Sequence, residues 1–540
     1  KCEHGGIASV IARCSFSQAG FCPNLKASSC NLAENALVSE LGTPIRPQSI
    51  TMERLQSCMA ALQDEDVRKR AVQDAKEYAI SHGLCMKSKS QEPDSYTFVP
   101  FCLLPSPYPR EAFQQVKALQ EDINLLIHRV AHDYSFLRDC LQSTIETDEF
   151  TASIFNIYQK VWEAEFPQPI SLGLLRSDYM LDLKSGDTKE LHEARPKQVE
   201  VNTIASSFGG ITPPLYKLQK YTMSNLGVVA TEVEVSICDI GNHRLMPKCK
   251  TDKLLGKGLL AGWRAYKNDK AAILFVVEEE TYNVCDQRNL EYAIREMHES
   301  VKVMRRKFSE LHNCTIQEGN LIVDGVEIAV VYYRTAYAPQ QMDAKCWDTR
   351  LRIELSRAIK CPSVQYHLAG TKKVQQVLAQ PDVLERFFTN KVIANSIRAT
   401  FTGLYSLDLT PQGHKAAEEA IAHPRNYVLK PQREGGGNNV YGDDVRNKLQ
   451  ALGRTKEREG YILMDLIQPP ITTNYIVRST EEASKCNVVS ELGIFGVILG
   501  DQYELIENYE AGHIVRTKMT GTSEGGICAG FASLDSVFLV

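Results

Sequence analysis

The sequence predicts a mixed α/β protein, because its middle part alternates buried strands with helices. An unbroken apolar run at residues 271–277 is followed by a helix-like stretch at 290–298 and by a second apolar run at 301–304. Strands that are buried on both faces of a parallel sheet show such runs, so we expect a strand-helix-strand unit here. Residues 321–333 hold two strand-like runs around an Asp-Gly pair, which predicts a hairpin that enters a further strand.

Two stretches nearer the N-terminus predict helices. Apolar residues recur at three- and four-residue steps over residues 50–83 and again over 113–134. This spacing places them on one face of an α-helix, where they can cover a sheet or another helix. We therefore expect several lobes in which helices pack against sheets.

The charge balance of the chain indicates a small-molecule substrate. The 540 residues include 61 Lys and Arg against 66 Asp and Glu, a formal net charge of −5. This balance gives no basic excess that would point to nucleic acid or to an anionic membrane surface. The longest apolar runs also fall far short of the roughly 20 residues that a membrane-spanning helix needs.

The N-terminal region is unusual in its cysteine content. Cys2, Cys14, Cys22 and Cys30 lie in a stretch without a strong helix or strand period, and their gaps are too wide for paired zinc ligands. Two interpretations stay open: disulfides formed in an oxidising compartment, or free thiols on a loose tail. Because the chain begins with Lys1 and not with Met, we expect that a targeting segment was removed or that the chain was trimmed.

The most informative segment is a glycine-rich run at residues 427–442, which reads Tyr-Val-Leu-Lys-Pro-Gln-Arg-Glu-Gly-Gly-Gly-Asn-Asn-Val-Tyr-Gly. A short apolar strand delivers Lys430, and the three glycines that follow allow backbone amides to approach a phosphate closely. The spacing matches neither a Walker loop nor a dinucleotide-binding G-x-G-x-x-G motif. A triple glycine alone is typical of a flexible turn, but the flanking Lys, Arg, Glu and paired Asn favour a phosphate-binding loop.

This run resembles the glycine-rich lid loop of eukaryotic glutathione synthetase, an ATP-grasp ligase. Further blocks that are similar to this family stand in the same order at residues 176–180, 200–204, 368–376, 490–496 and 516–518, and the resemblance covers roughly residues 95–540. It implies an antiparallel sheet core with packed helices, a parallel-sheet substrate domain and a glycine-rich lid. The implied division is a Cys-rich tail at 1–48, an ATP-grasp core at 49–265 and 486–540, a substrate-binding α/β domain at 266–372, and a helical linker and lid at 373–485.

The resemblance implies that ATP, γ-glutamylcysteine and glycine are converted into glutathione, ADP and phosphate through an acyl phosphate. The ATP-binding residues that it implies are Glu200, Lys372, Lys430, Asn439, Tyr441, Met464, Glu491, Lys518 and Glu524. Magnesium would be held by the oxygen donors of Glu200, Asn202 and Glu434, as a hard cation prefers. Glu200 and Asn202 are two apart on a probable strand, so both side chains point to one face.

The substrates carry carboxylates, which the forked side chain of Arg suits well. For γ-glutamylcysteine, the resemblance implies a pocket that consists of Arg176, Ser207, Asn283, Gln287, Arg334 and Tyr337. For glycine, it implies that Arg516 holds the carboxylate and steadies the transition state, with Ile527 and Cys528 shaping the acceptor pocket. Gly435 and Gly436 would lie over the transferring phosphoryl group.

Partners and compartment follow from the same resemblance. It implies a homodimer with small-molecule substrates and without a nucleic-acid or membrane partner. It also implies a cytoplasmic location, while the Cys-rich tail and the missing initiator Met leave secretion as an alternative.

Four sites that face the substrates or the nucleotide depart from the family pattern. They are Ala205 in place of Ser, Thr281-Tyr282 in place of Glu-Arg, Leu466 in place of a basic residue, and Ile527-Cys528 in place of Val-Ala. Because the residues for metal and phosphate are intact, we expect ATP chemistry to persist. The departures leave open an ATP-grasp relative with an altered donor or acceptor, or a secreted effector with weak or no glutathione synthesis. A weaker resemblance connects the chain to the secreted glutathione-synthetase-like effectors of plant-parasitic nematodes.

Overall fold

The computed structural model describes residues 47–89, 92, 94–183, 190–228, 245–434, 437–522, 526–527 and 530–540. Contacts divide the chain into two units, residues 1–50 and 51–540. The first unit is described only from Pro47, so Cys2, Cys14, Cys22 and Cys30, and with them both interpretations of the tail, lie outside the described residues. The domain boundaries expected within the second unit stay a prediction.

Seven of the described strands form the central sheet of the second unit, in the order β17-β3-β20-β19-β18-β5-β6. They are β3 (Phe101–Cys102), β5 (Ser171–Asp182), β6 (Arg195–Asn202), β17 (Thr472–Val477), β18 (Lys485–Gly500), β19 (Leu505–Met519) and β20 (Ala532–Asp535). Every neighbouring pair is antiparallel except β20 with β3. The expected antiparallel sheet core is therefore confirmed.

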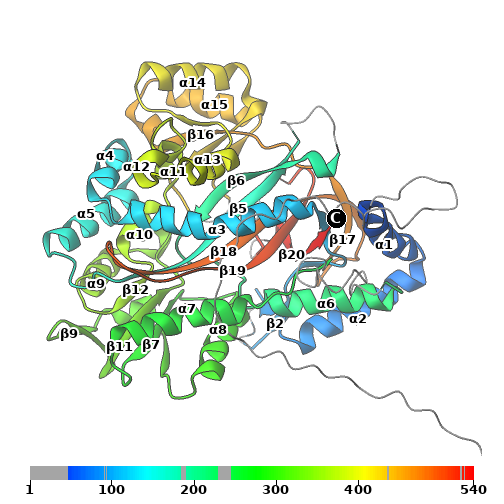
Figure 1. Ribbon diagram of the computed structural model, residues 1–540, viewed down its shortest axis with the longest axis horizontal. Helices are drawn as coiled ribbons and strands as arrows, with labels where there is room; N and C mark the ends of the chain where they lie inside the picture. The colour runs from blue at the N-terminus through cyan, green and yellow to red at the C-terminus, as the bar shows by residue number, and fades with distance from the viewer. Residues whose placement is uncertain are drawn as a thin grey trace, which may run out of the picture. The chain divides into compact units, whose positions relative to one another are not determined.

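Two helices cover opposite faces of this sheet, α3 (Arg110–Ala131) and α7 (Thr251–Tyr266). Figure 1 shows α3 lying across the long strands. A Cβ at Gly496 of β18 would meet Asn124 of α3, whereas a Cβ at Gly258 of α7 would meet Val497. Because consecutive strand residues point to opposite faces, the two helices lie on opposite sides of β18. The amide of Asn124 also donates to groups of both β18 and β19, which fastens α3 to the sheet.

Six further described strands form a second sheet, in the order β8-β7-β11-β10-β9 with β12 beside β11. They are β7 (Ala272–Val277), β8 (Val303–Lys307), β9 (Thr315–Gln317), β10 (Asn320–Val323), β11 (Val326–Tyr333) and β12 (Ile359–Cys361). β8, β7, β11 and β12 run parallel, and every residue of β7 is buried, as its apolar run predicts. The predicted hairpin is confirmed by the pairing of Val323 with Val326, and Asp324 and Gly325 form its turn at φ 51° and 75°.

Four described strands form a third sheet, in the order β13-β16-β14-β15. Its elements are β13 (Leu404–Ser406), β14 (Tyr427–Pro431), β15 (Val440–Tyr441), β16 (Tyr461–Asp465), α14 (Pro411–Ala422) and α15 (Asp443–Leu452). Leu429 and Leu463 pack against α14 and α15, which Figure 1 shows beside β16. Val428 and Lys430 therefore leave β14 on the opposite face. The glycine-rich run leaves β14 and returns as β15, with Gly435 and Gly436 outside the described residues.

The helical stretch expected over 50–83 is divided into α1 (Pro47–Ala61) and α2 (Glu65–Ser81). Asp64 causes the break, because its carboxylate accepts from two backbone amides at 2.9 and 3.0 Å and begins a new helix. Likewise, α3 ends at Ala131 and not at 134, because Asp133 caps the next helix through a backbone amide at 2.9 Å.

The other described helices are α4 (Tyr134–Ile145), α5 (Glu149–Glu163), α6 (Thr212–Asn225), α8 (Val284–Met297), α9 (Ala344–Glu354), α10 (Val364–Ala369), α11 (Lys372–Leu378), α12 (Leu384–Phe387) and α13 (Lys391–Thr400). The short 3-10 turns are η1 (Leu191–Glu193), η2 (Phe308–Leu311), η3 (Pro339–Gln341), η4 (Pro424–Asn426) and η5 (Lys456–Gly460). The remaining strands pair as β1 (Cys85–Lys87) with β2 (Tyr96–Phe98), and β4 (Ser106–Tyr108) with β21 (Val537–Leu539). Within the described ranges, no helix combines the length and the apolar character that crossing a membrane requires.

The substitution Gly496→Ala is expected to destabilise the second unit. The added Cβ would lie 2.0 Å from Oδ1 of Asn124, and such overpacking costs about 1–3 kcal/mol. Urea denaturation measures the loss. Gly256→Ala in α7 is the matched control, because its Cβ would meet the flexible end of Met297 at 3.1 Å while alanine gains up to about 1 kcal/mol of helix propensity. Equal stability of the two variants would contradict the packing of α3 on β18.

Candidate functional site

A group of buried and half-buried charges joins the central sheet to the third sheet. We call it the charge cluster, and it consists of Arg176, Asp178, Glu200, Lys372, Lys430, Glu434, Glu491 and Arg516. Strand pairing places Asp178 of β5 opposite Glu200 of β6, and Glu491 of β18 opposite Arg516 of β19. Gly493 leaves room for the cluster, because a Cβ there would lie 2.8 Å from atoms of both Arg176 and Asp178.

The fully buried carboxylate of Asp178 connects three strands. It accepts from Nε and Nη2 of Arg176 at 2.7 and 2.9 Å, from Nδ2 of Asn202 at 2.8 Å and from Nη2 of Arg516 at 2.7 Å. Arg516 also pairs with Glu491. Burial by itself lowers the pKa of Arg516, but these two carboxylates raise it above its ordinary value, so Arg516 stays charged. Burial raises the pKa of Glu491.

Lys372 begins α11 and bridges two carboxylates. Its Nζ lies 3.0 Å from Oε2 of Glu200 and 3.3 Å from each carboxylate oxygen of Glu434. Burial favours a higher pKa for Glu200, but the charges of Lys372 and Lys430 outweigh burial and hold this pKa well below its usual range. Lys430 donates to the carbonyl of Val199 at 3.0 Å, and burial lowers its pKa to about 8. Lysines and carboxylates that meet in this way suit a polyphosphate together with a hard cation.

An apolar patch adjoins Lys430 on the same face of β14. It consists of buried Val428, Met464 and Ile467, with partly buried Met180, Val199, Leu404 and Tyr441 packed against them. The hydroxyl of Tyr441 accepts from Nδ2 of Asn439 at 3.2 Å. An apolar surface beside two lysines suits a ligand with a planar base and phosphates. The structure therefore brings Met464, Asn439 and Tyr441 together, whereas it places Glu491 beside Arg516.

A tight turn follows β6 and is held by the carboxylate of Asp286. Ala205 and Phe208 adopt left-handed φ angles of 50° and 76°, which residues with side chains rarely take. Asp286 accepts from the amides of Phe208 at 2.8 Å and of Gly210 at 2.7 Å. A Cβ at Gly210 would lie 2.0 Å from the carbonyl oxygen of Asp286. These contacts fix the turn against the first turn of α8.

Most of the predicted substrate residues meet at Ser207 in this turn. Arg334 and Asn283 donate to its hydroxyl at 2.8 and 3.3 Å, and Arg176 donates to its carbonyl at 3.1 Å. Gln287 donates to Oδ1 of Asn283 at 2.9 Å. Arg334 is 1% exposed, and its Nε is buried without a partner in the described part of the chain. Two forked cations beside a hydroxyl suit a carboxylate-bearing peptide.

Three further predicted residues are placed by their packing or by their position on a strand. Tyr337 follows β11 and packs against the core of the second sheet. Ile527 is buried in the main apolar core, and Lys518 stands two residues after Arg516 on β19, on the same face. Glu524 and Cys528, like Gly435 and Gly436, lie outside the described residues.

Two of the departures from the family pattern have clear contacts. Tyr282 packs against the main core, and its hydroxyl donates to Glu280 at 3.1 Å. The amide of Leu466 donates to the carbonyl of Asn426 at 2.8 Å. Sequence reasoning assigned no role to Asp178, although this residue stands two positions after Arg176 in a family-like block, which places both side chains on one face of a strand.

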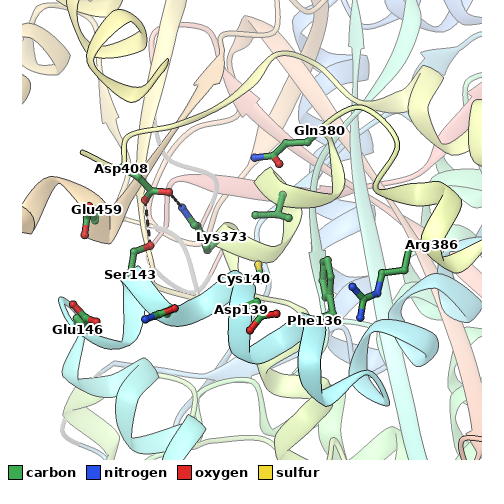
Figure 2. A pocket seen from close by; sticks show the side chains of 12 residues that line it. Phe136, Asp139, Cys140, Ser143, Glu146, Lys373, Gln380, Arg386, Asp408 and Glu459 are labelled. Atoms are coloured by element: carbon green, nitrogen blue, oxygen red, sulfur yellow. Dashed lines mark hydrogen bonds and ion pairs between the residues drawn. The ribbon is translucent and has the colours of Figure 1, made fainter. Parts of the chain in front are cut away.

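A polar cavity of about 570 Å³ lies beside α4 and α11, and no predicted site residue lines it (Figure 2). Lys373 forms part of its wall, with Nζ 2.5 Å from Oδ2 of Asp408, and Ser143 donates to Oδ1 of the same carboxylate at 3.2 Å. The amide of Lys373 donates to Oε1 of Gln432 at 3.1 Å. Lys372 thus enters the charge cluster while its neighbour Lys373 ties α11 to the third sheet.

The substitution Lys373→Met is expected to destabilise this junction. The Lys373 side chain is 4% exposed, and its removal leaves Asp408 without its cation, at a cost of about 3 kcal/mol. Chemical denaturation measures the change. Lys456→Met is the control, because Lys456 is 57% exposed in its pair with Glu146 of the same cavity and exposed pairs contribute at most about 1 kcal/mol. Similar small losses in both variants would contradict a structural role for the Lys373–Asp408 pair.

Comparisons with known proteins agree with this geometry. The family model described as "Eukaryotic glutathione synthase, ATP binding domain" matches residues 65–539. Glutathione synthetase of Xenopus laevis is 40% identical over 467 residues, which cover 86% of this chain and 95% of that protein. Glutathione synthetase of Homo sapiens is 38% identical over 485 residues, which cover 89% and 98%. A solved structure of a glutathione synthetase-like effector from Globodera pallida superposes with a TM-score of 0.69 at 26% identity, over 88% of this chain and 98% of that one.

Proposed function

Because the chain belongs to the eukaryotic glutathione synthase family of ATP-dependent ligases, we propose that it joins γ-glutamylcysteine to glycine. The observation that supports this most directly is the charge cluster, in which Lys372 bridges Glu200 and Glu434 next to Arg516. Such a site can neutralise a triphosphate and a carboxylate at the same time. The homodimer expected from the resemblance stays a prediction.

The reaction needs a better leaving group on the γ-glutamylcysteine carboxylate. A carboxylate oxygen attacks the γ-phosphorus of ATP, and ADP leaves with its electron pair. The glycine nitrogen then attacks the acyl phosphate, the carbon–oxygen bond breaks, and phosphate leaves while the amine loses a proton to solvent. Lys372 and Lys430 neutralise charge on the phosphates in this proposal, and the apolar patch around Met464 holds the base.

A magnesium ion fits the donors that this site provides. Glu200 and Glu434 turn carboxylate oxygens toward one point, since both contact the single Nζ of Lys372. Asn202 directs its NH₂ group to Asp178, so its carbonyl oxygen remains the donor for a cation. Magnesium held by these three residues would neutralise phosphate charge.

The two substrates would bind at two places in the site, one beside Arg176 and Arg334 and the other beside Arg516. γ-Glutamylcysteine would be bound by Arg176, Ser207, Asn283, Gln287, Arg334 and Tyr337. Nε of Arg334, which has no hydrogen-bond partner within the described ranges, would be a further donor. Arg516 would bind the carboxylate of glycine, and its charge would steady the transition state of the second step.

A direct assay tests the proposal. The purified chain is incubated with ATP, Mg²⁺ and γ-glutamylcysteine, with glycine, β-alanine, serine or cysteine as acceptor. ADP release and product mass are followed. Glutathione that forms only with glycine is expected. Product formed with another acceptor would show that the enzyme has an altered acceptor specificity. The absence of product with every acceptor would contradict ligase activity.

Arg516→Ala should separate the two steps. We expect glycine-dependent product formation to fall about 10²- to 10³-fold, because one charged donor to the transition state is lost. The rate of phosphate transfer from ATP to γ-glutamylcysteine in the absence of glycine should fall much less. Positional isotope exchange in ATP measures this rate. Arg425→Ala is the control, since this arginine is 80% exposed. Equal losses in both steps would contradict a specific role with glycine.

Ala205→Ser should strengthen the binding of γ-glutamylcysteine. The added hydroxyl restores a donor at the turn, and a hydrogen bond to a charged group contributes about 1.5 kcal/mol, roughly a 10-fold decrease in KM. Ser206→Ala is the control, because the Ser206 hydroxyl is buried and its single proton is shared between the carbonyls of Leu174 and Asn202, each 3.3 Å away. An unchanged KM in Ala205→Ser would indicate that position 205 does not face the substrate.

A further inference from the structure

A second group of metal-ligating side chains lies beside the second sheet, and the proposed ligase reaction does not use it. The ligand atoms of His312, Asp343 and Cys346 all lie within 4.8 Å of one another. His312 directly follows η2, while Asp343 caps α9 and Cys346 stands in its first turn. Together they offer the nitrogen, oxygen and sulfur donors that zinc and related ions bind.

A hydrogen bond with Thr349 fixes the tautomer of His312. The hydroxyl of Thr349 donates its only proton to the carbonyl of Lys345 at 2.7 Å. Its oxygen therefore accepts from Nδ1 of His312, which lies 3.0 Å away. A neutral imidazole that is protonated on Nδ1 carries its lone pair on Nε2, which is then the ring nitrogen available to a metal ion. A hydrogen bond of this kind orients histidine ligands at metal sites.

The other two ligands are also held in place. Oδ1 of Asp343 accepts from the amide of Cys346 at 2.7 Å, which holds the carboxylate at the start of α9. Cys346 is 7% exposed, whereas Asp343 is exposed, so solvent reaches the group from one side. Arg352 donates to the carbonyl of His312 at 2.9 Å and holds that backbone against α9.

We propose that His312, Asp343 and Cys346 bind one divalent transition-metal ion, with zinc preferred and the fourth position open to water. Ligands of a tetrahedral zinc lie about 3.5 Å apart. Because no two ligand atoms of the group are more than 4.8 Å apart, the side chains need to approach by at most about 1.3 Å. The thiol proton passes to solvent, and thiolate and carboxylate then balance the 2+ charge of the ion. The ion links the end of η2 to the start of α9, just after the loop that carries Tyr337.

Cobalt(II) tests the site independently of ligase activity, because its bond to a thiolate gives an absorption band. Cobalt is titrated into the full chain, and zinc affinity is measured by competition with a chromophoric chelator. We expect that Cys346→Ser and His312→Ala each bind one equivalent of cobalt less than the unaltered chain. Both variants should also lack the cobalt–thiolate absorption band. Thr349→Val should keep the band but bind zinc about 10- to 100-fold more weakly, because it no longer orients His312.

Cys314→Ser is the matched control, since Cys314 is buried in the same core but is not one of the three ligands. It should keep both the band and the affinity. Unfolding transitions establish that each variant is folded. An absorption band that persists in Cys346→Ser and His312→Ala would overturn the proposal. A zinc affinity of the unaltered chain that is no higher than that of these two variants would also overturn it, because the binding would then be adventitious only.

Discussion

The neutrality of buried charge in the charge cluster is the constraint on which the rest of the second unit depends. An ion removed from water costs several kcal/mol unless partners surround it. Here the cations and the carboxylates are equal in number: Arg176, Lys372, Lys430 and Arg516 against Asp178, Glu200, Glu434 and Glu491. Each member therefore fixes the position of its neighbours. The register of β5, β6, β18 and β19, the start of α11 and the attachment of the third sheet are thereby linked.

The same balance explains how the site can accept a nucleotide. ATP brings negative charge and magnesium brings positive charge, so in the proposed complex the ion pairs within the cluster would be exchanged for ion pairs with the two ligands. Lys372 would turn from the carboxylates to phosphate, and Glu200 and Glu434 would turn to the metal. Glu434 directly precedes the three glycines in the sequence, so this exchange would involve the residue at which the glycine-rich run begins. In this proposal, nucleotide binding would act on Glu434 through Lys372, whose Nζ lies 3.3 Å from both carboxylate oxygens of Glu434.

Features encoded locally were predictable from the sequence, and features that depend on distant partners were not. The 321–333 hairpin depends on two adjacent residues with φ suited to a turn, and the placement of Lys430 depends on the strand before the glycines. The role of Asp178 depends on Arg516, which is 338 positions away and reaches it only through sheet pairing. The break at Asp64 depends on one carboxylate within an otherwise continuous helical pattern. The pairing of Glu491 with Arg516 follows from the register of β18 and β19, which periodicity does not specify.

We propose that the charge cluster binds ATP together with magnesium. A crystal structure of the chain with Mg²⁺ and a non-hydrolysable ATP analogue tests it most directly. We predict that Nζ of Lys372 contacts phosphate oxygens, that Glu200 and Glu434 bind the metal, and that the base lies on the patch around Met464. A nucleotide bound elsewhere, or a Lys372 that still bridges Glu200 and Glu434 with the analogue bound, would contradict the claim.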